Sequence, residues 1–301
     1  MFPYTLSENL RVIGHPYFQL YLIKGTHASA LVEVGITATA EAVIRQLSSL
    51  KTSPDYLIVT HPHSDHFCGL DILKWAYPHA AVIAGSGAAE FLDYPAVRKS
   101  MILEDRHMAV FMAQQGVASS RQAIDAAPSS SGWMTATDGE KLDLGGVGIR
   151  FLEAKGHAPG NILVHIESSD TILVSDSLGY HYPGHGFFPI FFTGYADYMA
   201  TIDRIEALHP KIIGLAHHGF MQGPEVRDTI QKAKEDADRV MIRIAEDQRE
   251  DEAIAHDLFR DYYRDEMSLY TRGNILLCCR LLVRRVMEYQ GSCKNDKRLT
   301  R

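Results

Sequence analysis

The stretch Thr60-His61-Pro62-His63-Ser64-Asp65-His66 decides the fold of this chain. It places three histidines and one aspartate within six positions, a density of imidazole that packing alone does not require. Neutral imidazole nitrogens and carboxylate oxygens are ligands of Zn²⁺ and of comparable first-row metal ions. The stretch follows the apolar run Tyr56–Val59, which we interpret as a buried strand, and Pro62 prevents the loop from continuing as strand or helix. The sequence therefore predicts a metal-binding loop at the C-terminal end of a strand, where α/β folds place their sites.

The spacing within this loop favours two metal ions over one. His61 and His63 are two positions apart, so they point the same way in an extended segment, whereas Asp65 and His66 can face a second centre. Four ligands from six residues are cramped around a single tetrahedral ion. We therefore expect two neighbouring ions, each completed by residues from elsewhere in the chain. The alternative is a solvated, histidine-rich surface loop.

The composition is that of an ordinary globular protein. The 301 residues are 46% hydrophobic and 22% charged, and the net charge of −7 without a basic block argues against a nucleic-acid surface. The N-terminal residues do not resemble a signal peptide, and arginines interrupt the apolar segment 275–287, so no membrane span is predicted. The four cysteines show no disulfide framework, which favours a cytoplasmic location.

The order His-x-His-x-Asp-His in residues 61–66 resembles the signature of the metallo-β-lactamase superfamily. The resemblance implies three further ligands in the order His, Asp, His, each at the end of a strand. His157 lies in a Gly-His-Ala-Pro-Gly turn, and Asp176 follows the apolar run 171–174. The family usually has Gly-His-Gly at the last position, where this chain has His217-His218-Gly219, so His218 aligns as the ligand. His217 could then support the metal shell, touch substrate or simply be packed.

The resemblance thus implies a complete site for two divalent metal ions. Zn, Fe and Mn all suit these ligand types. The family pattern implies that a hydroxide held between the ions is the nucleophile, and that Asp65 and His218 are catalytic. The implied ligands are His61, His63 and His157 for one ion and Asp65, His66 and His218 for the other, with Asp176 bridging.

The position of Glu33 raises a separate question. The superfamily usually has an aspartate there, which holds the metal loop from behind. Glu33 could do the same with a longer reach, or it could be a surface carboxylate at a strand end.

The fold implied by the resemblance is an αββα sandwich, in which two mixed sheets are flanked by helices. The pattern predicts strands at 17–23, 30–34, 56–59, 81–84, 147–153, 162–166, 171–174 and 211–215, and helices at 40–50, 69–77 and 200–208. We expect a catalytic domain over residues 1–223 with a helical insertion at about 86–132. Residues 224–301 form a predicted helical tail, with helices at 225–247, 251–263 and 275–287, that serves as a lid or a homodimer surface.

By its layout the chain resembles the bacterial quinolone-signal-response thioesterases, near the glyoxalase II-like proteins. This resemblance implies hydrolysis of a small acyl thioester, such as a coenzyme A conjugate. Phosphodiester hydrolysis is one alternative, and a regulatory ligand-binding role is another. The aromatic segment after Asp176 is expected to contact substrate through Tyr180, His181, Tyr182 and His185, unless it is a surface loop packed beneath the tail.

Overall fold

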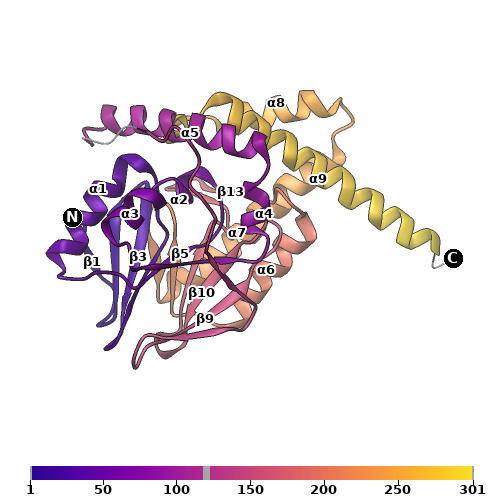
Figure 1. Ribbon diagram of the computed structural model, residues 1–301. Coiled ribbons are helices and arrows are strands. Elements are labelled where there is room, and N and C mark those ends of the chain that lie inside the picture. The colour runs from indigo at the N-terminus through magenta and orange to yellow at the C-terminus, as the bar shows by residue number, and fades with distance from the viewer. Residues whose placement is uncertain (1, 118–122, 300–301) are drawn as a thin grey trace.

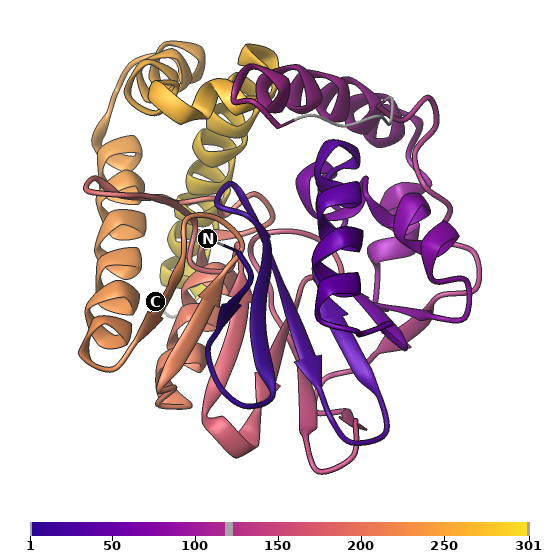
Figure 2. The same cartoon turned by 90° about the vertical axis from the view of Figure 1, so that its left-hand side faces the viewer.

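The computed structural model describes residues 2–117 and 123–299, and the side chains of this range up to residue 292. Two mixed sheets pack face to face, with helices on both outer faces (Figures 1 and 2). This arrangement confirms the αββα sandwich with C-terminal helices that the sequence predicts.

The first sheet carries the metal-binding loop near its centre. Its first four strands are antiparallel, and the strands from β4 to β7 are parallel. In spatial order the strands are β1 (Tyr4–Thr5), β2 (Leu10–His15), β3 (Phe18–Lys24), β4 (Ser29–Val32), β5 (Tyr56–Val59), β6 (Ala81–Gly85) and β7 (Met134–Ala136).

The second sheet is antiparallel except where β11 pairs with β14. In spatial order its strands are β15 (Phe220–Gln222), β14 (Ile212–Leu215), β11 (Thr171–Ser175), β10 (Ile162–Ile166), β9 (Gly148–Glu153) and β8 (Lys141–Asp143). A separate antiparallel pair, β12 (Tyr180–Tyr182) and β13 (Gly186–Phe188), leaves the second sheet after Asp176.

The helices cover the sheets with apolar faces. Val43 and Leu47 of α1 (Thr37–Ser49) and Leu73 of α3 (Leu70–Ala76) pack on the first sheet. Helices α6 (Tyr195–Ala207) and α7 (Pro224–Glu246) pack on the second. Between the two sheets, apolar side chains of both inner faces form a third cluster that includes Ile58 and Val164.

A second group of helices lies across the end of the sandwich where β5 and β11 finish (Figures 1 and 2). Besides the short α2 (Ser64–Phe67), it consists of α4 (Ala88–Leu92), α5 (Pro95–Gln114), α8 (Asp251–Tyr262), a 3₁₀ turn η2 (Asp265–Leu269) and α9 (Arg272–Leu299). The predicted insertion at 86–132 is helical from Ala88 to Gln114 apart from a break at 93–94. Part of it, residues 118–122, lies outside the described residues.

The C-terminal helices share a hydrophobic cluster with the second sheet. Ile230 of α7, Leu258 of α8 and Leu282 of α9 are buried together with Leu163 and Ile213. The tail therefore does not pack as a separate unit, and the predicted division of the chain at residue 223 stays a prediction. None of the described helices has the length and apolar character needed to cross a bilayer.

Candidate metal centre

The predicted metal loop lies where the ends of the two sheets meet. Thr60 follows β5, and its carbonyl accepts a hydrogen bond of 2.9 Å from the backbone N–H of Ile162 at the start of β10. This contact ties the loop to the second sheet, whose strand β11 ends at Ser175, directly before Asp176. His61 and Asp176 are both buried. The fold thus brings together segments that are more than 100 positions apart in sequence.

A first group of side chains, which we call the three-histidine cluster, consists of His61, His63 and His157 with Asp176. The potential ligand atoms of this cluster all lie within 4.8 Å of one another. The Nε2 atoms of His61 and His157 are 3.2 Å apart, and each lies 3.7 Å from Oδ2 of Asp176. All four residues were predicted as ligands, and the structure brings them together.

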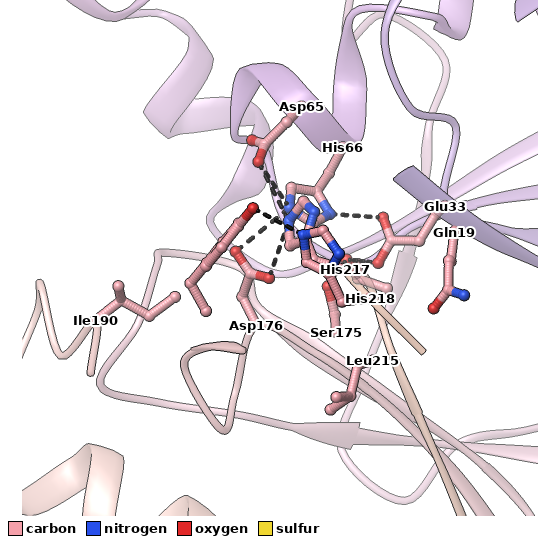
Figure 3. A network of polar contacts seen from close by, with 12 residues as sticks. Gln19, Glu33, Asp65, His66, Ser175, Asp176, Ile190, Leu215, His217 and His218 are labelled. Carbon is pink, nitrogen blue, oxygen red and sulfur yellow. Dashed lines mark hydrogen bonds and ion pairs between the residues drawn. The ribbon is translucent and has the colours of Figure 1, made fainter. Parts of the chain in front are cut away.

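A second group, the Asp65 cluster, consists of Asp65, His66 and His217 with the same Asp176 (Figure 3). Oδ2 of Asp65 is 3.4 Å from Nε2 of both His66 and His217. The two carboxylate oxygens of Asp176 divide their contacts, with Oδ2 at 3.3 Å from His66 and Oδ1 at 3.5 Å from His217. Asp176 therefore belongs to both clusters, which is the position that a bridging carboxylate requires.

The structure corrects the sequence-based choice between the two adjacent histidines. His217, not His218, completes the Asp65 cluster. His218 has a φ of +57°, and its Nε2 instead lies 3.1 Å from the hydroxyl of Tyr180 and 3.2 Å from Glu266. The position after the ligand is thus left-handed, a conformation that usually favours glycine. The family pattern Gly-His-Gly, aligned on Gly219, puts the ligand at His218. Because His218 itself occupies the left-handed position after the ligand, the ligand is one residue earlier, and the catalytic role predicted for His218 loses its basis.

The ring orientations fit the binding of cations between these side chains. The Nδ1 atoms of His157 and His217 lie 2.9 Å and 2.5 Å from the carbonyl oxygens of Ile190 and Tyr17, and only a protonated nitrogen can donate to them. Their Nε2 atoms then point inward as the free ligand atoms. Nε2 of His217 and Oδ1 of Asp176 are buried without a hydrogen-bond partner among the described residues. These inward-facing acceptors fit divalent metal ions.

Burial sets the electrostatics of the three-histidine cluster. It lowers the pKa of His63 to about 3, and it also holds the pKa values of His61 and His157 below the usual value. These imidazoles are therefore neutral at neutral pH, which is the form that binds metal ions.

Carboxylates dominate the Asp65 cluster. Burial acts to lower the pKa of His66, but Asp65, Glu33 and Asp176 outweigh it and raise that pKa well above its usual value. Burial likewise acts to raise the pKa of Asp176, but His66 and the neighbouring histidines lower it to about 2. Asp65 and Asp176 also outweigh burial at His217 and raise its pKa, so a bound cation would take the place of the protons that these histidines otherwise hold.

Glu33 holds the metal loop from behind, as one of the two interpretations of the sequence predicts. It is buried at the end of β4, and its Oε1 accepts a hydrogen bond of 2.7 Å from the hydroxyl of Thr60. Its Oε2 lies 3.1 Å from Nδ1 of His66. This contact directs Nε2 of His66 toward the Asp65 cluster (Figure 3).

A cavity of about 310 Å³ opens against both clusters. Metal-loop residues and Asp176 form one wall, while α5, η2 and α9 form the opposite wall. Most of the other lining residues are apolar: Phe91, Ala96, Val97, Met101, Phe188, Ile190, Phe192, Met267, Ile275, Leu277 and Leu281. The C-terminal helices therefore help to enclose the site.

Of the four predicted substrate contacts, only Tyr180 lines this cavity. Tyr182 is buried and donates its hydroxyl to the carbonyl of Tyr262. His181 packs on the ring of Phe187, and His185 is exposed in the turn between β12 and β13. Alternation along β12 turns His181 to the side opposite Tyr180, whereas Tyr182 lies on the same side but reaches Tyr262, and His185 lies beyond the strand.

One further residue at the site was not predicted from the sequence. Tyr270, which directly follows η2, lines the cavity, and its hydroxyl donates a hydrogen bond of 2.7 Å to Oδ2 of Asp65. The two residues are 205 positions apart, and no local motif marks Tyr270.

Comparison with known proteins places this geometry in a family. A family model described as the metallo-beta-lactamase superfamily matches residues 19–217. The chain belongs to the metallo-β-lactamase superfamily. The matched range includes all residues of both clusters. The chain is therefore a member of a hydrolase superfamily and has a cluster of His and Asp side chains that could bind metal ions.

The individual relatives are distant. Glyoxylase B2 of Dictyostelium discoideum is 23% identical over 142 residues, which span 47% of this chain but only 41% of that protein. A metallo-β-lactamase fold-containing protein of Sulfurisphaera tokodaii is 24% identical over 75% of this chain and 81% of its own length. A metallo-β-lactamase family protein from Thermus thermophilus has a similar fold, with a TM-score of 0.69, 18% identity and 95% coverage of both chains.

Proposed function

We propose that this superfamily member is a metal-dependent hydrolase that cleaves a small thioester with an apolar acyl group and uses two divalent metal ions. The observation that carries the proposal is the apolar cavity that opens directly against the two clusters. A substrate bound there would have its acyl group among apolar side chains and its carbonyl carbon next to the cluster residues.

The residues have separate roles in this proposal. The three-histidine cluster would hold one ion and the Asp65 cluster the other, with Asp176 facing both. When bound, such ions ionise water at neutral pH and polarise the carbonyl of the substrate. Phe188 and Phe192 contribute apolar surface beside the clusters and would exclude water from the acyl group.

The relative from Dictyostelium supports this reaction class through its name, Glyoxylase B2. The cavity supports it over phosphodiester hydrolysis, because most of its lining is apolar and suits an acyl group better than a charged phosphodiester. An acyl thioester needs no cationic group at the acyl end.

The test is a panel of acyl-coenzyme A substrates of increasing chain length, with a benzoyl thioester and bis(p-nitrophenyl) phosphate beside them. Protein reconstituted with Zn²⁺, Mn²⁺ or Fe²⁺ should cleave at least one thioester faster than the phosphodiester, and chelation of the metal should abolish cleavage. No turnover of any thioester by metal-loaded protein would refute the proposal, and faster phosphodiester cleavage would replace it.

Two histidine variants provide a matched comparison. His157→Ala removes a residue of the three-histidine cluster and should abolish thioester cleavage. His256→Ala removes a half-exposed histidine of α8. In the described part of the chain this histidine forms an ion pair with Glu252 alone, so the variant should leave cleavage unchanged. Equal activity of the two variants would contradict the assigned site.

A further inference from the structure

In the described part of the chain, Tyr270 is the one tyrosine whose hydroxyl donates a hydrogen bond to a side chain of the two clusters. It reaches Oδ2 of Asp65 at 2.7 Å, and both residues are buried. The same oxygen atom faces Nε2 of His66 and of His217 at 3.4 Å. The hydrogen bond therefore acts on the oxygen that the Asp65 cluster would present to an ion.

Contacts with α5 fix the position of Tyr270. Glu104 of α5 is buried and accepts hydrogen bonds from both the backbone N–H and the hydroxyl of Thr271, the next residue. One turn along α5, Nε2 of His107 lies 2.9 Å from the carbonyl oxygen of Ser268. The segment from Ser268 to Thr271 is thus held on both sides of Tyr270.

We infer that Tyr270 is a positioning residue for metal binding, through which the C-terminal segment orients Asp65 and selectively tightens the ion of the Asp65 cluster. A carboxylate that is free to rotate spends less time in the geometry of a ligand, and partners that fix metal ligands typically change metal affinity by about 10–100-fold. Among the described residues, the three-histidine cluster has no hydrogen bond of this kind with Tyr270, so its ion should not depend on the hydroxyl. The inference rests on the proposed metal-dependent function.

The experiment compares Tyr270→Phe with Tyr263→Phe by chelator competition on Co²⁺-loaded protein, and the absorption spectrum of Co²⁺ reports on its ligand geometry. Tyr270→Phe keeps the ring and removes only the hydroxyl. Tyr263 donates its hydroxyl to the carbonyl oxygen of Tyr270 at 3.3 Å, so its variant loses a hydrogen bond of the same segment without touching Asp65. Spectra of His217→Ala and His157→Ala, each lacking one cluster residue, assign the signals of the two ions.

We expect Tyr270→Phe to release the Asp65-cluster ion at about 10–100-fold lower chelator concentration and to shift its spectrum, while the other ion stays as in the wild type. Tyr263→Phe should resemble the wild type in both respects, because its hydrogen bond of 3.3 Å is long and both hydrogen bonds from Thr271 to Glu104 still hold the segment. The inference would be overturned if Tyr270→Phe retained both ions as the wild type does, or if it lost affinity equally at both clusters. Failure of the wild type to bind metal would instead refute the proposed function, so the two failures are distinguishable.

A second variant covers the case in which Tyr270→Phe does not fold. Thr271→Val removes the hydroxyl that donates to Glu104 and accepts from the backbone N–H of Asn274, and it keeps Tyr270 itself. It should weaken the same ion to a smaller degree, because the backbone hydrogen bond from Thr271 to Glu104 remains at 3.0 Å. An unchanged affinity and spectrum in a folded Thr271→Val protein would then count against the inference.

Discussion

Replacement of Glu33 should both destabilise the protein and weaken metal binding. In Glu33→Ala, Nδ1 of His66 loses its acceptor at 3.1 Å, whereas the hydroxyl of Thr60 can redirect its proton to Ser175, whose Oγ is 3.1 Å away. One buried N–H group is thus left without a partner, and one hydrogen bond to a charged group is lost. Together these changes should cost about 2–4 kcal/mol in the free energy of unfolding.

The loss of this support should also lower metal affinity by about 10–100-fold, since His66 is no longer oriented. In Glu33→Gln, the amide oxygen can still accept from His66, and the amide nitrogen can donate to Thr60. Glu33→Gln should therefore lose less stability than Glu33→Ala, and the difference between them isolates the hydrogen bonds from the charge.

Urea unfolding of the metal-free protein, followed by circular dichroism, measures the stability, and chelator competition measures the affinity. Glu235→Ala on the exposed face of α7 is the control and should change the free energy of unfolding by less than about 0.5 kcal/mol. A Glu33→Ala protein that matches this control in stability and retains its metal like the wild type would show that Glu33 does not support the metal loop.

Three further predictions concern the turn before His157, the pH dependence of stability and the acyl cavity. Gly156 has a φ of +95°, and an added Cβ would lie 2.2 Å from the backbone nitrogen of Tyr198, so Gly156→Ala should lower the free energy of unfolding in urea by about 2–5 kcal/mol. The control Gly132→Ala, at φ +77° with no atom within 4 Å of the added Cβ, should lower it by only about 1–2 kcal/mol. Burial lowers the pKa of His165 below its usual 6.5, so the unfolded chain takes up the proton at a higher pH than the folded chain. The free energy of unfolding should therefore fall more steeply below pH 6.5 in the wild type than in His165→Gln, and parallel curves of stability against pH would contradict this. Val97→Phe narrows the cavity and should lower kcat/KM for long acyl groups about 10-fold or more relative to acetyl, whereas Val110→Phe, on the exposed part of α5, should keep the wild-type profile.

The parts of the fold and site that were predicted from the sequence are those that depend on local signals. The dense motif at residues 61–66, the Gly-His turn at His157 and the strand before Asp176 are each readable within a few positions, and the structure places all of them together. The apolar runs at 56–59 and 162–166 coincide with β5 and β10, because buried strands consist of continuous hydrophobic residues.

Other features depended on information that no short segment contains. The choice between His217 and His218 follows from the left-handed conformation at His218 and from the contact of His217 with Tyr17, and neither is visible in the residue order. Tyr270 reaches Asp65 only because α5 and the C-terminal helices meet across the site. The short strand β7 extends the first sheet by pairing with β6, although three residues provide too little pattern to predict it.

The most direct test of the two-metal site is a crystal structure of metal-loaded protein with anomalous scattering recorded at the absorption edge of the bound metal. We expect two peaks, one among His61, His63 and His157 and the other among Asp65, His66 and His217, with Asp176 between them. A second peak bound by His218 in place of His217, or the absence of stoichiometric metal after careful reconstitution, would contradict it.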